Sequence, residues 1–424
     1  MNESEPGRPA VTAHRLRPMS GRDPDEPHRV ATPLELLFDL TFAVAFGVAS
    51  AQLAELLADG HIAAGIVAFG FAVFAICLAW INFTWFASAY DTDDWAFRLL
   101  TMVQMVGVLI LGLGLPAFFE SVAEGGRVNN AVMVAGYVVM RIALVAQWFR
   151  AAHQDPARRP TARRYAMAIL LVQVAWIGTV FLPTRVPVTL GIWLVLAIFE
   201  LAAPWFVETR VGQTPWHPHH IAERYGSMAI IALGEGVVGT VTVLSAMVSD
   251  HGWSVDAVLL AISGTVLTFG MWWMYFTLPT AEVLHARRER AFWFGYLHMP
   301  VFGAIVATGS GLHSAALFIH HHSTLGSVGT VLSVAVPVLL YVVALFVLYG
   351  FLLKTAPDRL HLLLLVSTVL VLVVAVGLAM AGTSMAICLL VAGLAPAVGV
   401  LGYETLGHRH MAVALADTAA DTDR

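Results

Sequence analysis

Carboxylates at helical spacing inside apolar runs are the side chains in this sequence best suited to chemistry. Glu35 and Asp39 are four residues apart in TPLELLFDLTF, so a helix places both carboxylates on one face. Like charges on one face repel, and the pair therefore requires a proton, a metal ion or an arginine. The structural alternative is that Glu35 only complements the dipole of the first helical turn. We predict that both residues are catalytic.

An aspartate-rich turn follows in YDTDDWAFRLL. Clustered carboxylates at a membrane interface suit Mg²⁺, which takes oxygen ligands and keeps sites open for a phosphate. We predict that Asp91, Asp93 and Asp94 bind this metal ion and that Tyr90 and Arg98 bind substrate. The alternative is a solvated turn in which an aspartate caps the next helix.

A segment rich in histidine and charge, WHPHHIAERYGSMAIIALGE, supplies the third set. His220 and Arg224 are four residues apart and are predicted to bind substrate, the alternative for the histidine being simple polarity at the headgroup level. Glu223 and Glu235 are predicted to be catalytic. Glu235 follows Glu223 by twelve residues, which places it about 18 Å deeper in the membrane. Without a partner nearby in the sequence, Glu235 must be protonated, paired with another helix or facing water.

Arg141 is isolated in another apolar run and cannot lose its proton. Like Glu200 and Glu235, it falls near the middle of its predicted span. We predict a buried pair between Arg141 and either Glu235 or Glu200 that fixes helix packing. Arg141 is also counted among the candidate substrate-binding residues.

The composition indicates which elements position these groups. Of the 424 residues, 58% are hydrophobic and 12% are charged, with a mean hydropathy of +0.77. A soluble domain carries roughly 25% charged residues, so a soluble enzyme, a disordered chain and a nucleic-acid binder are excluded. The two cysteines lie in apolar runs, which argues against a disulfide framework or a zinc cluster. Because lipid leaves backbone groups unsatisfied, we predict an all-α polytopic bundle embedded in a lipid bilayer.

About twelve apolar segments are long enough to cross a membrane. Glu35 and Glu223 occupy similar places in two of them, with an offset of 223 − 35 = 188 residues. The same offset separates two polar span ends, which suggests two six-helix parallel repeats; the alternative is that amphipathic span ends look alike. The predicted spans are 33–57, 62–88, 97–119, 128–152, 163–183, 186–207, 221–248, 254–278, 291–318, 327–353, 360–380 and 384–404.

The positive charges predict the orientation. On this span map 19 of the 23 Lys and Arg residues fall at the termini or in loops that follow even-numbered spans. The positive-inside rule then places both termini in the cytoplasm, in a bacterial plasma membrane. We expect a disordered arm over 1–30, membrane halves over 31–207 and 208–406, and a cytoplasmic tail over 407–424.

Three motifs together resemble the bacterial low temperature requirement A family of membrane proteins. They are RVATPLELLFDLTF, YDTDDWAFRLL and HHIAERYGSMAIIALGE, and they depart from the family pattern at Leu37, Ile221 and Gly236. The resemblance implies the family and its topology, but no reaction, because the family name records a growth phenotype. The matching positions are Glu35, Asp39, Tyr90, Asp91, Asp93, Asp94, Arg98, His220, Glu223, Arg224, Gly226, Gly234 and Glu235.

Two function classes fit these residues. The first is a Mg²⁺-dependent enzyme of lyase, cyclase or transferase type that acts on a small hydrophobic or phosphorylated substrate, such as an isoprenoid or lipid diphosphate. The second is a proton- or ion-coupled secondary transporter that uses the intramembrane carboxylates. Carboxylates that converge on one cytoplasmic pocket or greasy tunnel favour the enzyme, whereas carboxylates strung out between both faces favour the transporter. The oligomeric state stays open.

Overall fold

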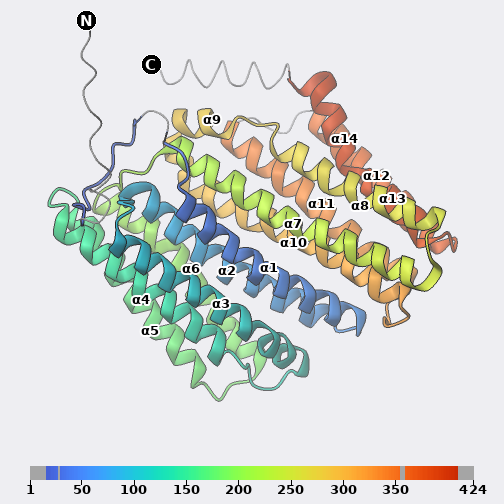
Figure 1. Ribbon diagram of the computed structural model, residues 1–424, viewed down its shortest axis with the longest axis horizontal. Helices are drawn as coiled ribbons and strands as arrows, with labels where there is room; N and C mark the ends of the chain where they lie inside the picture. Colours follow the sequence, from blue (N-terminus) through green and yellow to red (C-terminus); the bar gives the residue numbers. More distant parts are fainter. Residues whose placement is uncertain (1–15, 27–28, 354–358, 409–424) are drawn as a thin grey trace, which may run out of the picture.

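The predicted all-α bundle is confirmed by a computed structural model, which describes residues 16–26, 29–353 and 359–408 (Figure 1). Eleven segments of the described chain are long and apolar enough to cross a membrane. The helices are α1 (Pro33–Ala58), α2 (Ile62–Tyr90), α3 (Trp95–Glu124), α4 (Ala131–Gln154), α5 (Arg159–Val180), α6 (Val186–Arg210), α7 (Pro218–His251), α8 (Val255–Tyr275), α9 (Thr280–Ala286), α10 (Ala291–Ile319), α11 (Ser327–Leu353), α12 (Arg359–Met380), α13 (Met385–Gly393) and α14 (Ala395–Gly402).

Each predicted span corresponds to one of these helices or to a consecutive pair. α5 is the helix that falls outside the eleven, because its first turns carry Arg159, Arg163 and Arg164. The last span is divided at Leu394 into α13 and α14. Pro396 lies in the first turn of the second piece, where its missing N–H leaves no helical hydrogen bond unmade.

Neighbour relations within α1–α6 largely recur within α7–α14. α1 packs on α2 and α3, and α7 packs in the same way on α8 and α10; α3 lies along α4, as α10 lies along α11. This is the arrangement that two six-helix repeats would give, and the duplication itself stays a prediction. One helix interface of the second half has no counterpart in the first half. α8 packs along α13, but the corresponding helices α2 and α6 form no comparable interface.

Small residues permit the closest helix approach in the first half. A Cβ added at Gly136 on α4 would lie 2.3 Å from the backbone nitrogen of Leu111 on α3. Backbone contact of this kind is how membrane helices gain packing energy without a hydrophobic driving force. We infer that Gly136 is required by the interface between α3 and α4 rather than by helix geometry.

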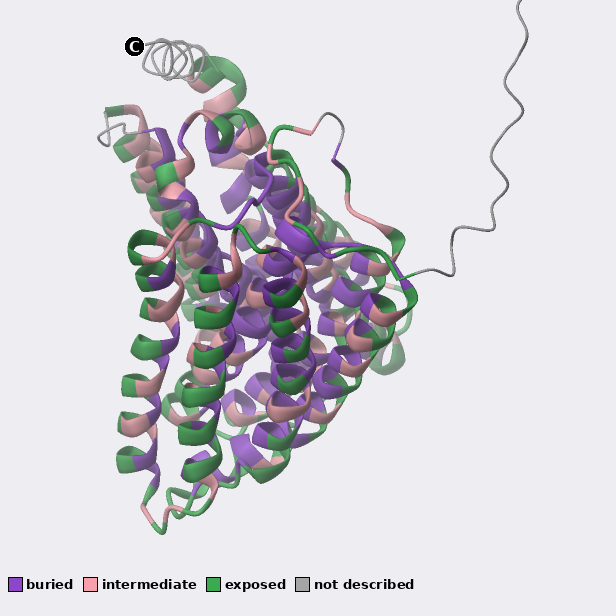
Figure 2. Cartoon of the chain, turned by 90° about the vertical axis from the view of Figure 1, so that its left-hand side faces the viewer, coloured by how far each residue is buried: buried purple, intermediate pink, exposed green. Residues whose placement is uncertain are grey.

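Exposed side chains on the outer surface of the bundle are largely apolar, as lipid requires. Figure 2 shows buried residues along the interior and exposed ones on the outward helix faces. Leu113 on α3 and Val174 on α5 are 76% and 68% exposed. Apolar exposure over many helices at once is typical of a surface that meets acyl chains.

The segment that precedes α1 lies across the predicted cytoplasmic ends of the helices. The backbone N–H of Gly21 donates to Asp155 Oδ2 at 3.1 Å, and that of Arg22 donates to the carbonyl of Ala89 at 2.9 Å. Met19 between the helix ends is fully buried. Residues 16–26 of the expected arm therefore have defined contacts, whereas residues 1–15, 27–28 and the tail beyond 408 lie outside the described residues.

Candidate functional site

Four of the predicted site residues meet between α1 and α7 on the predicted cytoplasmic side. Arg224 Nη1 lies 2.8 Å from Glu35 Oε1, and its Nε and Nη2 donate to the two oxygens of Asp39 at 3.1 and 2.5 Å. His220 Nε2 lies 3.1 Å from Glu35 Oε1. The arginine anticipated for the carboxylate pair is thus Arg224, which comes from the first helix of the other half.

Local structure explains how α1 presents these carboxylates. Thr32 caps α1 by accepting from the Glu35 N–H, while the Glu35 side chain accepts from the Thr32 N–H at 2.8 Å, which completes a capping box. One turn later, Trp80 Nε1 on α2 donates to Asp39 Oδ1 at 2.6 Å. The dipole interaction that was the alternative for Glu35 therefore coexists with its ion pair.

Burial makes this network costly to disturb. Glu35, Asp39, His220 and Arg224 each expose none of their surface. One arginine faces two carboxylates, so a proton on either carboxyl or on His220 brings the network to neutrality. A buried set of this kind is destabilised strongly when a single member is removed.

The three aspartates of the turn between α2 and α3 go to separate partners. Asp94 caps α3 by accepting from the Phe97 N–H at 2.9 Å and forms an ion pair with Arg150. Asp93, with a positive φ of 47°, forms an ion pair with the exposed Arg98 at 2.8 Å. Burial opposes ionisation of Asp94, but the hydrogen bonds from Arg150 and from backbone N–H groups hold the pKa of Asp94 well below its usual range.

This arrangement fits a Mg²⁺ ion poorly. The oxygens of Asp93 and Asp94 are already occupied by arginine and backbone donors. The described residues contain no group of three or more His, Cys, Asp or Glu side chains placed to hold a metal ion. Mg²⁺ dependence stays a prediction.

Asp91 is buried and lies 3.8 Å from Arg29. Burial, with a smaller contribution from the nearby Glu35, raises the pKa of Asp91 to about 6, against the opposing effect of Arg29.

We expect this shift to make stability fall as pH rises. The folded state holds the Asp91 proton up to about pH 6, whereas the unfolded chain releases it near its ordinary pKa of 3.8. Relative to Asp91→Asn, the wild type should therefore lose up to about 3 kcal/mol of unfolding free energy between about pH 4 and pH 7. Thermal unfolding in detergent over this pH range, followed by circular dichroism, measures the difference. A difference that does not vary with pH would contradict the expectation.

Three other predicted residues lie apart from the network. Glu223 is exposed on α7 and accepts from the Ala31 N–H at 3.1 Å. Tyr90 is buried at the end of α2, with its ring 5.7 Å from that of Trp148. Arg98 is exposed beside Asp93. The geometry gives Glu223 and Arg98 no direct part in a buried site.

Arg141 pairs with Glu200, one of its two anticipated partners. Arg141 Nη2 lies 3.0 Å from Glu200 Oε1 and donates to the Tyr137 hydroxyl at 2.6 Å. All three side chains are buried between α4 and α6. Among the described helices α6 packs mainly on α5, and this ion pair links it to α4 as well.

A large cavity lies between α2 and α6, whose interface is sparse. Its volume is about 480 Å³, and its walls come from α2, α4, α5, α6, α10 and the loop before α7. Trp205 and Trp293 are more than half exposed and mark its opening between α6 and α10. The aromatic side chains of the lining are Trp85, Trp148, Tyr165, Trp205, Trp216, Phe292, Trp293 and Tyr296.

The polar groups of this cavity are concentrated at its predicted cytoplasmic end. Arg158 and Arg288 line it there. Glu208 also lines it, but its carboxylate is engaged by the hydroxyls of Tyr165 and Thr214 at 2.8 and 2.7 Å. The cavity thus combines an aromatic chamber with guanidinium groups near its polar end, and Glu289 adds a second carboxylate to the lining.

This cavity was not predicted from the sequence. Five of the chain's 12 tryptophans line it, and their gathering near one end of several spans was the available signal. Tryptophan at span ends is, however, also typical of the membrane interface.

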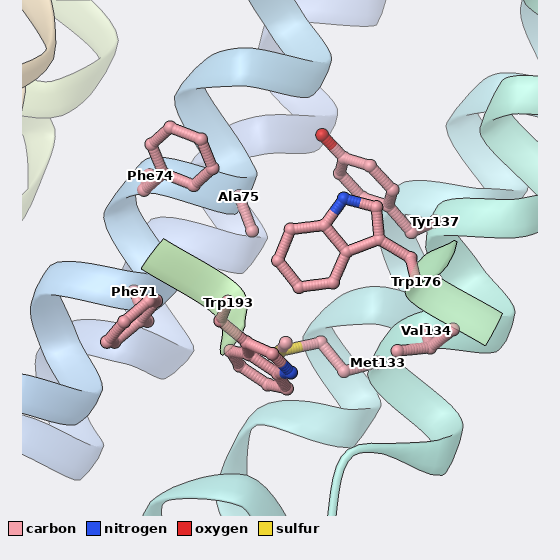
Figure 3. Close-up of a pocket in the computed structure, with 8 residues that line it drawn as sticks. All are labelled: Phe71, Phe74, Ala75, Met133, Val134, Tyr137, Trp176 and Trp193. Carbon is pink, nitrogen blue, oxygen red and sulfur yellow. The ribbon is translucent and has the colours of Figure 1, made fainter. Parts of the chain in front are cut away.

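A second, apolar pocket of about 20 Å³ lies between α2, α4, α5 and α6 and is lined by Phe71, Trp176 and Trp193 among others (Figure 3).

Two side chains, Tyr225 and Trp80, connect the wall of the cavity to the charged network. Trp85 Nε1 in the cavity wall donates to the Tyr225 hydroxyl at 3.1 Å. The Tyr225 ring packs edge-on against Trp80, at 4.8 Å between centroids, and Trp80 donates to Asp39. The network therefore braces the wall of the cavity without lining it.

Fold and site together define a multi-pass all-α membrane protein with ionisable groups paired between its helices. A family model described as bacterial low temperature requirement A protein (LtrA) matches residues 30–396, and the chain belongs to this family. An uncharacterized protein of Rhizobium meliloti (strain 1021) is 29% identical over 296 residues, which cover 65% of this chain and 67% of that protein. No solved structure matches the chain.

Proposed function

We propose that this protein is a membrane-embedded enzyme that binds an isoprenoid diphosphate in the cavity between α2, α6 and α10. The observation that carries the proposal is the combination of an aromatic chamber of about 480 Å³ with Arg158 and Arg288 at its polar end. An apolar isoprenoid chain suits the chamber, and guanidinium groups suit a diphosphate. The opening beside Trp205 and Trp293 would admit a substrate dissolved in the bilayer.

The chemistry proposed for this cavity is loss of the diphosphate. The bond between the allylic carbon and the diphosphate oxygen breaks, and the oxygen keeps the electron pair. Arg158 and Arg288 would stabilise the negative charge that develops on the leaving group. The faces of Trp85, Trp148 and other lining rings would stabilise the allylic cation that remains. Loss of a proton from this cation to the departing diphosphate would then give a neutral hydrocarbon. Glu35, Asp39 and Arg224 would act as positioning residues through Trp80 and Tyr225.

Incubation of the purified protein with prenyl diphosphates tests this proposal. Protein in lipid nanodiscs would receive geranyl, farnesyl or geranylgeranyl diphosphate, with and without MgCl₂. Diphosphate release and the hydrocarbon products would be measured by a colorimetric assay and gas chromatography–mass spectrometry. We expect release above the rate of an empty nanodisc, and the two salt conditions decide the Mg²⁺ prediction. The proposed enzyme is contradicted if the protein neither releases diphosphate nor binds a prenyl diphosphate of any chain length.

A second candidate is a proton-coupled transporter. The observation that favours it is the position of the charged network, since Glu35 and Asp39 on α1 meet Arg224 on α7 where the two halves join. Transporters built from parallel repeats bind substrate and coupling ions at such a junction. Flux driven by a pH gradient in liposomes, without prenyl diphosphate turnover, would favour this candidate over the enzyme.

A further inference from the structure

We propose that Glu235 is an exchangeable proton-binding site at the junction of the two halves. This inference goes beyond the proposed enzyme and does not depend on it. Glu235 lies on α7 with 8% of its surface exposed. Two glycines bring neighbouring helices against it: a Cβ added at Gly47 on α1 would lie 3.2 Å from its Oε1, and one at Gly309 on α10 would lie 2.7 Å from its carbonyl oxygen.

The polar surroundings of Glu235 are two hydroxyl groups. Ser50 on α1 donates a hydrogen bond to the carboxyl group, and Ser310 Oγ on α10 donates to Ser50 Oγ at 3.1 Å. Both serines are fully buried. The three helices therefore converge on one carboxyl through a short chain of neutral donors.

No cation among the described residues compensates this carboxylate. The titratable side chains on the surrounding helices have other partners or no contact with Glu235. Asp39 and Arg224 pair with each other, and Asp250 lies 3.2 Å from His320. His298 forms hydrogen bonds with Tyr275 and with the Phe294 carbonyl. Asp256 and His313, on α8 and α10, form no hydrogen bond or ion pair with Glu235 in the described structure. Glu200, by contrast, is buried with an arginine.

The physical consequence is that the closed junction favours a neutral Glu235. An ionised carboxylate in a membrane interior with only a hydroxyl donor is strongly penalised. Releasing the proton therefore requires water at this carboxyl, and we expect separation of α1 from α7 and α10 to admit it. Proton exchange at Glu235 is in this way tied to movement of one half against the other.

Infrared difference spectroscopy of the full-length protein in nanodiscs tests the assignment. The wild-type minus Glu235→Gln spectrum should contain the C=O stretch of a protonated carboxyl at neutral pH, and that band should decline as the pH is raised. Above the midpoint the protonated fraction should fall about tenfold per pH unit. Ser50→Ala removes the hydrogen-bond donor that stabilises ionised Glu235. The band of protonated Glu235 should therefore persist to higher pH in this variant than in the wild type. Absence of the band at every pH would overturn the proposal.

Chemical labelling supplies a second, independent readout. Dicyclohexylcarbodiimide adds to protonated carboxyl groups in apolar surroundings, and mass spectrometry of the digested protein locates the adduct. We expect labelling of Glu235 that decreases as the pH rises. Glu200 is the matched control, because it is buried to the same degree but paired with Arg141. A band or a label that does not change between acidic and alkaline pH would mean that the proton does not exchange, and would contradict the proposal.

Discussion

Replacing Arg224 by methionine should remove about 3–5 kcal/mol of stability, enough to unfold many membrane proteins in detergent. The substitution leaves two carboxylates, Glu35 and Asp39, fully buried without their cation. Trp80 and His220 still contact them, but these groups do not replace the charge. The loss should appear as a lower apparent melting temperature and as aggregation in size-exclusion chromatography.

Two further variants separate charge from packing at this position. Combining Arg224→Met with Glu35→Gln and Asp39→Asn removes the uncompensated charges, and should recover part of the lost stability. Arg98→Ala is the control, since its ion pair with Asp93 is exposed and should contribute less than about 1 kcal/mol. If the triple variant were less stable than Arg224→Met alone, burial of uncompensated charge would not be the cause of the loss.

Filling the cavity with a large side chain should reduce binding and turnover of the proposed substrate by at least about tenfold, which corresponds to about 1.4 kcal/mol. Thr209 is an exposed residue of α6 that lines the cavity. Its replacement by tryptophan would place an indole in space that the substrate chain requires. Binding of a fluorescent prenyl diphosphate analogue and release of diphosphate would measure the effect.

A matched variant distinguishes cavity filling from damage to the fold. Thr242 on α7 is also exposed, and its hydroxyl donates to the carbonyl four residues earlier, as that of Thr209 does. Thr242 does not line the cavity, so Thr242→Trp should bind and turn over substrate like the wild type. Equal binding by Thr209→Trp and the wild type would contradict the location of the substrate site.

The helix positions, and the need of each buried charge for an oppositely charged partner, could be predicted from the sequence. The identity of most of these partners could not. The spacing of Glu35 and Asp39 places them on one face of a helix, and their like charge requires a cation. Nothing local indicates that the cation is Arg224, which lies 185 residues after Asp39. In the same way, Arg141 required a carboxylate, but the choice between Glu200 and Glu235 depended on which helix lies beside α4.

The aspartate-rich turn was harder to interpret for a related reason. A cluster in sequence suggests shared ligation, yet Asp93 and Asp94 face different arginines. Arg150 comes from the end of α4, so this distribution depends on how the ends of α2, α3 and α4 lie together. The cavity between α2 and α6 is still less accessible to sequence reasoning, because it results from an interface that is not formed.

The contacts of the segment before α1 have a consequence for biogenesis. Residues 16–26 are synthesised before α1–α4, yet Met19 and Gly21 bind Gln154 and Asp155, which are 135 and 134 residues later. The hydrogen bond to the carbonyl of Pro24 forms later still, because its donor Arg288 follows Pro24 by 264 residues. The segment can therefore dock only after α4 has been inserted, and its last contact forms only when α10 begins. Docking of residues 16–26 can therefore be complete only after α1–α9 have been synthesised.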